Sequence, residues 1–162
     1  MNFNDDCNVP MLTLMSFGFA EGKPSPDEVD HVFRLTNIPN PEVSLRKKYT
    51  GCHQELQKAI FNLYGVPERY ESLKDEINRL IDQLPVPADP SEPLADLTLA
   101  FGCHTGQHRS VAIVERLGLE KWTGYQIQII HRDVNKPSKT SREKDIKNQR
   151  RLKQQQNMTF WE

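Results

Sequence analysis

The 162-residue sequence lacks several features that would assign it to a particular class of protein. It has no apolar run near the roughly 18 residues that a membrane span needs, and its first residues do not form a signal peptide. Its three cysteines, Cys7, Cys52 and Cys103, are too few and too scattered for a disulfide framework or a Cys-x-x-Cys metal site. We therefore expect a cytoplasmic protein in a reducing compartment, with no membrane partner.

The net charge of −1 conceals a strong asymmetry along the chain. Between Lys136 and Lys153, eight basic residues stand against two acidic ones, a local charge of +6 that leaves −7 for the rest. Apolar residues are nearly absent there, so we expect this tail, residues 136–162, to be an exposed helix or disordered. A basic tail can serve only solubility, but this charge density also suits RNA phosphates. The candidate RNA-binding residues are Lys136, Lys139, Arg142, Lys144, Lys147, Arg150, Arg151 and Lys153.

The rest of the chain predicts one α/β domain over residues 11–135, after a flexible N-terminus of residues 1–10. Apolar alternation or short apolar runs predict four strands, at residues 11–19, 30–36, 97–102 and 125–131. Apolar residues at helical spacing predict helices at residues 52–64, 67–84 and 110–117. Two segments are expected to lack regular structure: a basic loop at residues 42–51 and a proline-rich connection at residues 85–96. The expected fold is a small parallel or mixed sheet flanked by helices.

The most informative stretch is residues 97–117, which predicts a buried strand, a short polar loop and a helix. Such a loop presents unpaired backbone N–H groups and the positive end of the helix dipole, an arrangement that suits phosphate. Its side chains add hydrogen-bond donors, and Gly102 and Gly106 allow close backbone approach; the donors are His104, Thr105, His108 and Arg109. The sequence therefore predicts recognition of a phosphate group.

A second segment of the chain is expected to reach the same edge of the sheet. If the strand at 125–131 lies beside the strand at 97–102, His131 and Arg132 arrive next to the phosphate loop. His104 and His108 are four residues apart, but they lie in a loop and have no Glu-x-x-His frame, so we expect no metal site. We expect no cofactor either.

Five short blocks occur in a fixed order along residues 11–135. They are Ser16-Phe17-Gly18-Phe19; Asp30 with Val32-Phe33 and Pro39-Asn40-Pro41; Leu45-Arg46 with Thr50-Gly51; Gly102-Cys103, Gly106 and His108-Arg109-Ser110-Val111; and His131-Arg132-Asp133. In this order they resemble the carboxy-terminal domain of the RapZ family of RNase adaptor proteins. The resemblance implies a domain like part of a phosphofructokinase that binds an amino-sugar phosphate (glucosamine-6-phosphate) and small RNA. It also implies regulation through a protein partner, without substrate turnover in this domain.

The resemblance also implies a set of ligand-binding residues in this chain. These are Asp30, Arg46, Cys103, His104, Thr105, Gly106, His108, Arg109 and Ser110, with His131 and Arg132 close by. The chain departs from the family at Arg34 and Thr36, where an acidic residue and an arginine are usual, and at His104-Thr105, where Thr-Gly is usual. It has no Walker A motif, so the resemblance is to the carboxy-terminal module standing alone. A second copy of this chain is left open as a further partner.

An enzymatic interpretation arises from the same loop. Cys103, Arg109 and Ser110 form a Cys-x5-Arg-Ser pattern, which resembles the phosphate loop of cysteine-dependent phosphatases. In that class a thiolate at a helix amino end attacks phosphorus and an arginine holds the phosphoryl oxygens. The mechanism also needs a general acid, for which Asp133 or Asp30 is available. We favour a binding module over this enzyme, because a small residue lining a pocket is the simpler role for Cys103.

Overall fold

The structure is a computed structural model that describes residues 9–137 and 139–158. Four parallel strands form one sheet in the order β2-β3-β1-β4; they are β1 (Met11–Gly18), β2 (His31–Arg34), β3 (Leu97–Cys103) and β4 (Gln126–His131). The predicted α/β fold is confirmed, and the sheet is parallel, not mixed. β1 lies between β3 and β4, so the two strands considered as neighbours in the sequence analysis are not adjacent.

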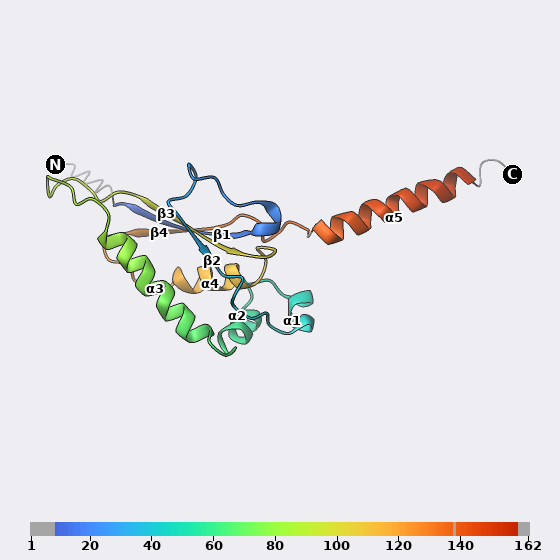
Figure 1. Ribbon diagram of the computed structural model, residues 1–162, viewed down its shortest axis with the longest axis horizontal. Coiled ribbons are helices and arrows are strands. Elements are labelled where there is room, and N and C mark those ends of the chain that lie inside the picture. Colours follow the sequence, from blue (N-terminus) through green and yellow to red (C-terminus); the bar gives the residue numbers. More distant parts are fainter. Residues whose placement is uncertain (1–8, 138, 159–162) are drawn as a thin grey trace, which may run out of the picture.

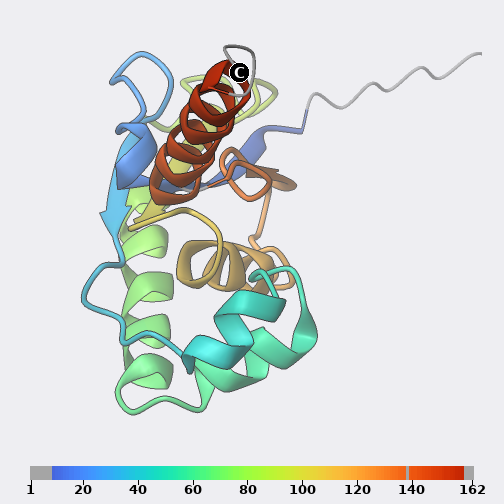
Figure 2. The ribbon, with the colours of Figure 1, turned by 90° about the vertical axis from the view of Figure 1, so that its right-hand side faces the viewer.

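Four helices cover one face of this sheet (Figures 1 and 2). They are α1 (Val43–Lys48), α2 (Gln54–Phe61), α3 (Val66–Asp82) and α4 (Arg109–Leu117). α1 corrects the prediction of a loop at residues 42–51: it is a six-residue helix in which no residue is fully buried and only Leu45 packs on the core, so the sequence shows no apolar stripe of helical spacing there. None of the helices in the described part of the chain is both long and apolar enough to cross a membrane.

The side chains of β1 alternate between the two faces of the sheet, and this alternation builds two apolar clusters. Leu12 and Leu14 face the helices, where they pack with the stripe of α3. Phe17 faces the other way and packs with Ala100 and with Val29, from the loop that joins the short 3-10 helix η1 (Phe19–Glu21) to β2. The helices therefore cover one face of the sheet, and among the described residues the second cluster covers the other face at β1, β2 and β3 only.

Glycines allow the loop after β3 to pack directly on the end of β1. Gly106 has a φ of 73°, and a Cβ there would lie 2.4 Å from the backbone nitrogen of Gly18. A Cβ at Gly18 would lie 2.4 Å from the carbonyl carbon of Thr105. Because atoms cannot approach this closely, a side chain at either position would force the two segments apart. The glycines therefore fix the loop against the carboxyl edge of the sheet.

Helix α5 (Lys139–Met158) projects away from the domain at the same edge (Figure 1). Its 20 residues span about 30 Å. An ion pair between Arg142 and Glu21 joins it to the domain, and the Gln107 side chain donates to the carbonyl of Lys136 just before it, at 2.5 Å. Of the two states expected for the tail, the structure shows the exposed helix.

Candidate functional site

A small cavity opens at the carboxyl edge of the sheet, between the loop after β3, the start of α4, and α1. Its volume is about 90 Å³, and it is lined by Asn40, Arg46, Cys103, His104, Thr105, His108 and Arg109. The lining contains two arginines and no carboxylate, so it favours an anion. This volume is far below the roughly 300–1,000 Å³ of a typical pocket for a drug-sized ligand. That space suits a tetrahedral anion better than a whole sugar or nucleotide.

The backbone around the cavity offers unused donors. Among the described residues, the carbonyls of His104, Gln107 and His108 accept hydrogen bonds, whereas the amides of residues 105–108 donate none to the protein. α4 begins at Arg109 with no side-chain cap from His108, so its first-turn N–H groups also lack side-chain acceptors. Thr105 and His108 line the cavity, so an anion there would lie close to unpaired amides and to the positive end of the α4 dipole.

The Arg109 guanidinium is held in place by the chain segment that follows β2. Arg109 is only 7% exposed, and its Nη1 donates to the carbonyls of Ile38, at 2.6 Å, and Thr36, at 3.2 Å. These bonds use one nitrogen of the guanidinium group, while Nε and Nη2 make no hydrogen bond to the described residues. Arg109 therefore has a structural role and also retains donors for a ligand.

Arg46 and His108 connect α1 to the start of α4. The Arg46 Nε donates to the carbonyl of Pro41 at 3.0 Å, and the Arg46 carbonyl accepts from His108 Nε2, also at 3.0 Å. Burial lowers the pKa of His108, although the bond to the Arg46 carbonyl opposes this shift. The imidazole is therefore neutral at neutral pH, and the positive charge of the cavity comes from the two arginines.

Comparison with known proteins identifies the family of this chain. Residues 10–135 match the family described as the RapZ C-terminal domain. The chain belongs to this family. A curated "Nucleotide-binding protein" from Caldicellulosiruptor saccharolyticus is 36% identical over 133 residues, which cover 80% of this chain and 42% of the relative. One from Lacticaseibacillus casei is 32% identical over 143 residues, covering 86% of this chain and 46% of the relative.

The chain thus spans less than half the length of these curated relatives. The RapZ C-terminal domain is a regulatory module of RNase adaptor proteins. Within this family assignment, six of the residues that the sequence analysis selected line the cavity together: Arg46, Cys103, His104, Thr105, His108 and Arg109. Asn40 lines it too and was missed, although it lies in the Pro39-Asn40-Pro41 block that carried the resemblance.

Asp30 does not belong to this site of the RapZ C-terminal domain. It precedes β2, and its carboxylate accepts from the amide of Thr98, at the amino end of β3, at 2.7 Å. Five residues of extended strand, about 16 Å, separate Thr98 from Cys103. The prediction that Asp30 binds the ligand in this cavity is therefore wrong, because parallel strands place their amino and carboxyl ends at opposite edges.

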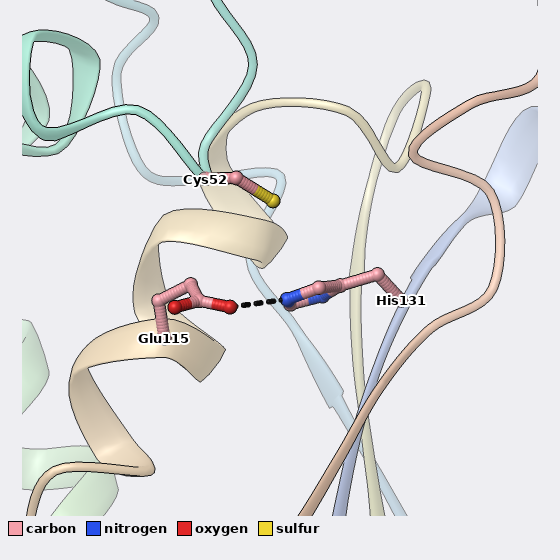
Figure 3. A group of neighbouring side chains, drawn as sticks. All are labelled: Cys52, Glu115 and His131. Atoms are coloured by element: carbon pink, nitrogen blue, oxygen red, sulfur yellow. Dashed lines mark hydrogen bonds and ion pairs between the residues drawn. The ribbon is translucent and has the colours of Figure 1, made fainter.

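The other selected residues do not line the cavity. Ser110 is fully buried, and its hydroxyl lies 3.1 Å from Cys103 Sγ and 3.4 Å from the carbonyl of Phe17. Gly106 provides the close approach described above. Arg132 is directed to the carbonyl of Gly22, at 2.6 Å, and to its neighbour Asp133. His131 belongs to a separate cluster with Glu115 and Cys52, drawn in Figure 3.

Neither candidate general acid for the phosphatase interpretation lies at the cavity. Asp133 is fully buried, and its carboxylate accepts from the amide of Gly18 at 2.8 Å and pairs with Arg132 and Lys136. Burial alone would raise the pKa of Asp133, but these donors outweigh it and lower the pKa below its usual value. Asp133 is therefore ionised at neutral pH and has no proton to donate, and Asp30 lies at the opposite edge of the sheet.

Proposed function

We propose that this domain binds the phosphoryl group of a phosphorylated small molecule in the cavity at the start of α4. The observation that carries the proposal is the lining itself: Arg46 and Arg109, uncapped amides of the loop and of α4, and no carboxylate. Charge-assisted hydrogen bonds from such donors are stronger than neutral ones. The small volume means that the rest of the ligand lies outside, toward solvent.

The family suggests which ligand this is. Membership in the RapZ C-terminal domain family favours an amino-sugar phosphate, with binding that regulates a protein partner. His104 is exposed at the rim of the cavity, where the family usually has threonine, so it is placed to contact the sugar and to alter which sugar is preferred. We therefore expect phosphate recognition to be shared with the family and sugar preference to differ.

A larger groove elsewhere on the domain suits this ligand less well. It has a volume of about 560 Å³ and lies between α2, α3 and the region after α4. Three glutamates line it, Glu68, Glu71 and Glu120, against two cations, Lys58 and Arg116. Carboxylates repel a phosphate, so the groove is a poor competitor despite its size.

Helix α5 is the second part of the proposal, as an RNA-binding element. Lys144, Lys147 and Arg151 lie three and four residues apart and so share one face, and all three are exposed. Lys136 and Arg142 are paired with Asp133 and Glu21 and contribute less charge. With no aromatic residue among the described residues of α5, phosphate contacts would dominate over base stacking.

Calorimetric titration with glucosamine-6-phosphate, inorganic phosphate and unphosphorylated glucosamine tests the phosphate site. Arg46→Gln should weaken binding of both phosphorylated ligands by about tenfold to a hundredfold, the worth of a hydrogen bond to a charged group. The main-chain carbonyl that holds His108 stays in this variant. Lys47→Gln is the matched control: it removes one cation from the same helix, but its side chain does not line the cavity.

Equal binding by the two variants would contradict the proposed site, and binding of glucosamine alone would contradict phosphate recognition. An aryl phosphate assay on the same samples addresses the enzymatic alternative. Turnover that disappears in Cys103→Ser, with folding intact by circular dichroism, would favour the phosphatase over the binding module. We expect no turnover.

A further inference from the structure

Three side chains with metal-ligating atoms converge next to the loop that supports the cavity. Cys52 precedes α2, Glu115 is on α4, and His131 ends β4. Their sulfur, carboxylate oxygen and ring nitrogen all lie within 4.8 Å of one another. Figure 3 shows the three side chains directed toward a common point. Within the described ranges, no other group of three or more His, Cys, Asp or Glu residues meets this criterion.

The imidazole is oriented by a buried partner. His131 Nδ1 lies 2.7 Å from the hydroxyl of Ser16, which is fully buried on β1. This contact turns Nε2 toward Glu115, 2.6 Å from the carboxylate. Histidines that bind metals almost always use their second nitrogen in this way, because the bond fixes the ring and leaves the other nitrogen for the ion.

The cluster is not arranged for nucleophilic catalysis. Both ring nitrogens of His131 are bonded, one to Ser16 and one to Glu115, so neither is bonded to the Cys52 thiol. Ser16 has no exposed surface and is out of reach of a substrate. Sulfur, oxygen and nitrogen ligands around one point, with a positioned histidine, instead match the coordination of a transition metal.

We propose that Cys52, Glu115 and His131 bind a divalent transition metal ion, with Zn²⁺ the best match. Zn²⁺ accepts thiolate, carboxylate and imidazole ligands, and sites with three protein ligands keep a fourth position for water. Cys52 is exposed and the Glu115 side chain is 35% exposed. The ion can therefore enter from solvent, and a water molecule can occupy the fourth coordination position. In a tetrahedral site with one sulfur, one oxygen and one nitrogen ligand, these atoms lie about 3.3–3.6 Å apart. The Glu115 oxygen and the His131 nitrogen, now 2.6 Å apart, would therefore separate slightly. Binding displaces the proton of the Cys52 thiol, and the Nε2 proton that His131 shares with Glu115 moves to Nδ1, which then donates to the Ser16 hydroxyl.

The metal site would brace the phosphate cavity. Gly51, beside Cys52, donates its amide to the carbonyl of Gln107 in the phosphate loop at 2.8 Å, and a Cβ at Gly51 would lie 2.3 Å from the carbonyl oxygen of His108. A metal ion that joins Cys52 to α4 and β4 would hold this contact in place. The inference does not depend on phosphate binding, since its ligands lie outside the cavity lining.

Co²⁺ titration of the full chain tests the site, because Co²⁺ replaces Zn²⁺ and has a visible spectrum. We expect equimolar binding with a thiolate-to-cobalt charge-transfer band and the intense visible absorption of four-coordinate Co²⁺. Zn²⁺ should remove both signals, and excess Mg²⁺, which prefers oxygen ligands, should not. Cys52→Ser alters an exposed side chain and should abolish the charge-transfer band without unfolding the protein. Glu115→Gln and His131→Gln should weaken Co²⁺ binding at least tenfold.

Two cysteine variants are the matched controls, Cys103→Ser in the cavity and Cys7→Ser, which lies outside the described residues; both should retain the charge-transfer band. A band that survives Cys52→Ser, or that disappears in either control, would assign the thiolate elsewhere and overturn the proposal. The absence of any saturable cobalt band in the wild-type protein would overturn it as well. Far-ultraviolet circular dichroism of each variant separates loss of the site from loss of the fold.

Discussion

The molecule holds its positive charges in two contrasting ways. At the cavity, Arg109 is buried and bonded to backbone carbonyls, and the loop around it is packed against β1 through Gly18 and Gly106. On α5, Lys144, Lys147 and Arg151 lie on the surface of a helix that projects into solvent. The first arrangement fixes donors before a ligand arrives, whereas the second leaves long side chains free to follow the ligand.

This contrast predicts that the two proposed sites recognise phosphate differently, one with and one without discrimination. Prepositioned donors in a small cavity lose little entropy on binding and select an anion of the right size and shape. Exposed cations on a helix release counterions from any phosphate backbone, so they add affinity that depends on salt and little on sequence. The two regions should therefore respond differently to mutation, salt and pH.

The largest effect is expected where the contrast depends on packing. Gly106→Ala should lower the free energy of unfolding by about 3 kcal/mol or more, combining left-handed strain with overpacking against Gly18. Gly65→Ala is the matched control: its φ is 78°, against 73° for Gly106, but a Cβ there meets nothing within 4 Å. It should cost only about 1–2 kcal/mol.

Urea denaturation of the two variants measures the difference directly. If Gly106→Ala is no less stable than Gly65→Ala, the loop is not held by close packing and the cavity donors are not prepositioned. Substitutions on α5, which is exposed, should leave the denaturation midpoint unchanged, and this would sharpen the contrast.

An intermediate effect is expected for RNA binding by α5. Replacing Lys144, Lys147 and Arg151 together with glutamine should reduce affinity for a short single-stranded RNA at low salt by at least about tenfold. Each phosphate contact contributes about 0.7 to the log–log salt slope for single strands, so the slope should fall by about 2. Fluorescence anisotropy over a series of salt concentrations checks both numbers. An unchanged slope would place the RNA contacts elsewhere.

The smallest effect is expected from the titration of His108. Its pKa in the folded protein is lowered mainly by burial, whereas in the unfolded chain it is near the ordinary value of about 6.5. Between these two values the unfolded state binds more protons, so stability is complete above about pH 6.5 and falls as the pH drops toward the folded pKa. His108→Gln retains a donor for the Arg46 carbonyl and should remove this part of the pH dependence. If the free energy of unfolding changes with pH identically in wild type and variant between about pH 5.5 and about pH 7.5, His108 does not contribute to the pH dependence and the prediction is wrong.

Elements whose residues carry their own periodicity could be predicted from the sequence. The apolar stripe Tyr70, Leu73 and Ile77 indicated a helix at 67–84, and the structure has α3 at Val66–Asp82. The buried strand, loop and helix at 97–117 were also predicted, as β3 and α4. Helix α1 was missed because it is short and packs only Leu45 on the core, which is too little for a helical spacing of apolar residues.

The remaining differences between the predicted and the observed site arise from how segments far apart in the sequence are placed in the fold. The position of β1 between β3 and β4 is a property of the crossovers. Asp30 lies at the far edge of the sheet because it precedes β2, and all four strands are parallel. Asn40 enters the cavity through the segment between β2 and α1, which no local pattern describes. Cys52, Glu115 and His131 come from three separate segments, so no metal-binding spacing could reveal them.

The most direct test of the central claim is a two-dimensional amide NMR titration of the uniformly ¹⁵N-labelled chain with glucosamine-6-phosphate. The account predicts saturable shifts of the amides of residues 104–110, the segment that contributes four residues to the cavity lining, with inorganic phosphate moving the same amides at higher concentration. The amides of α3 around the larger groove and those of α5 should stay in place. Shifts centred on the groove or on α5, with residues 104–110 unmoved, would contradict a phosphate site at the start of α4.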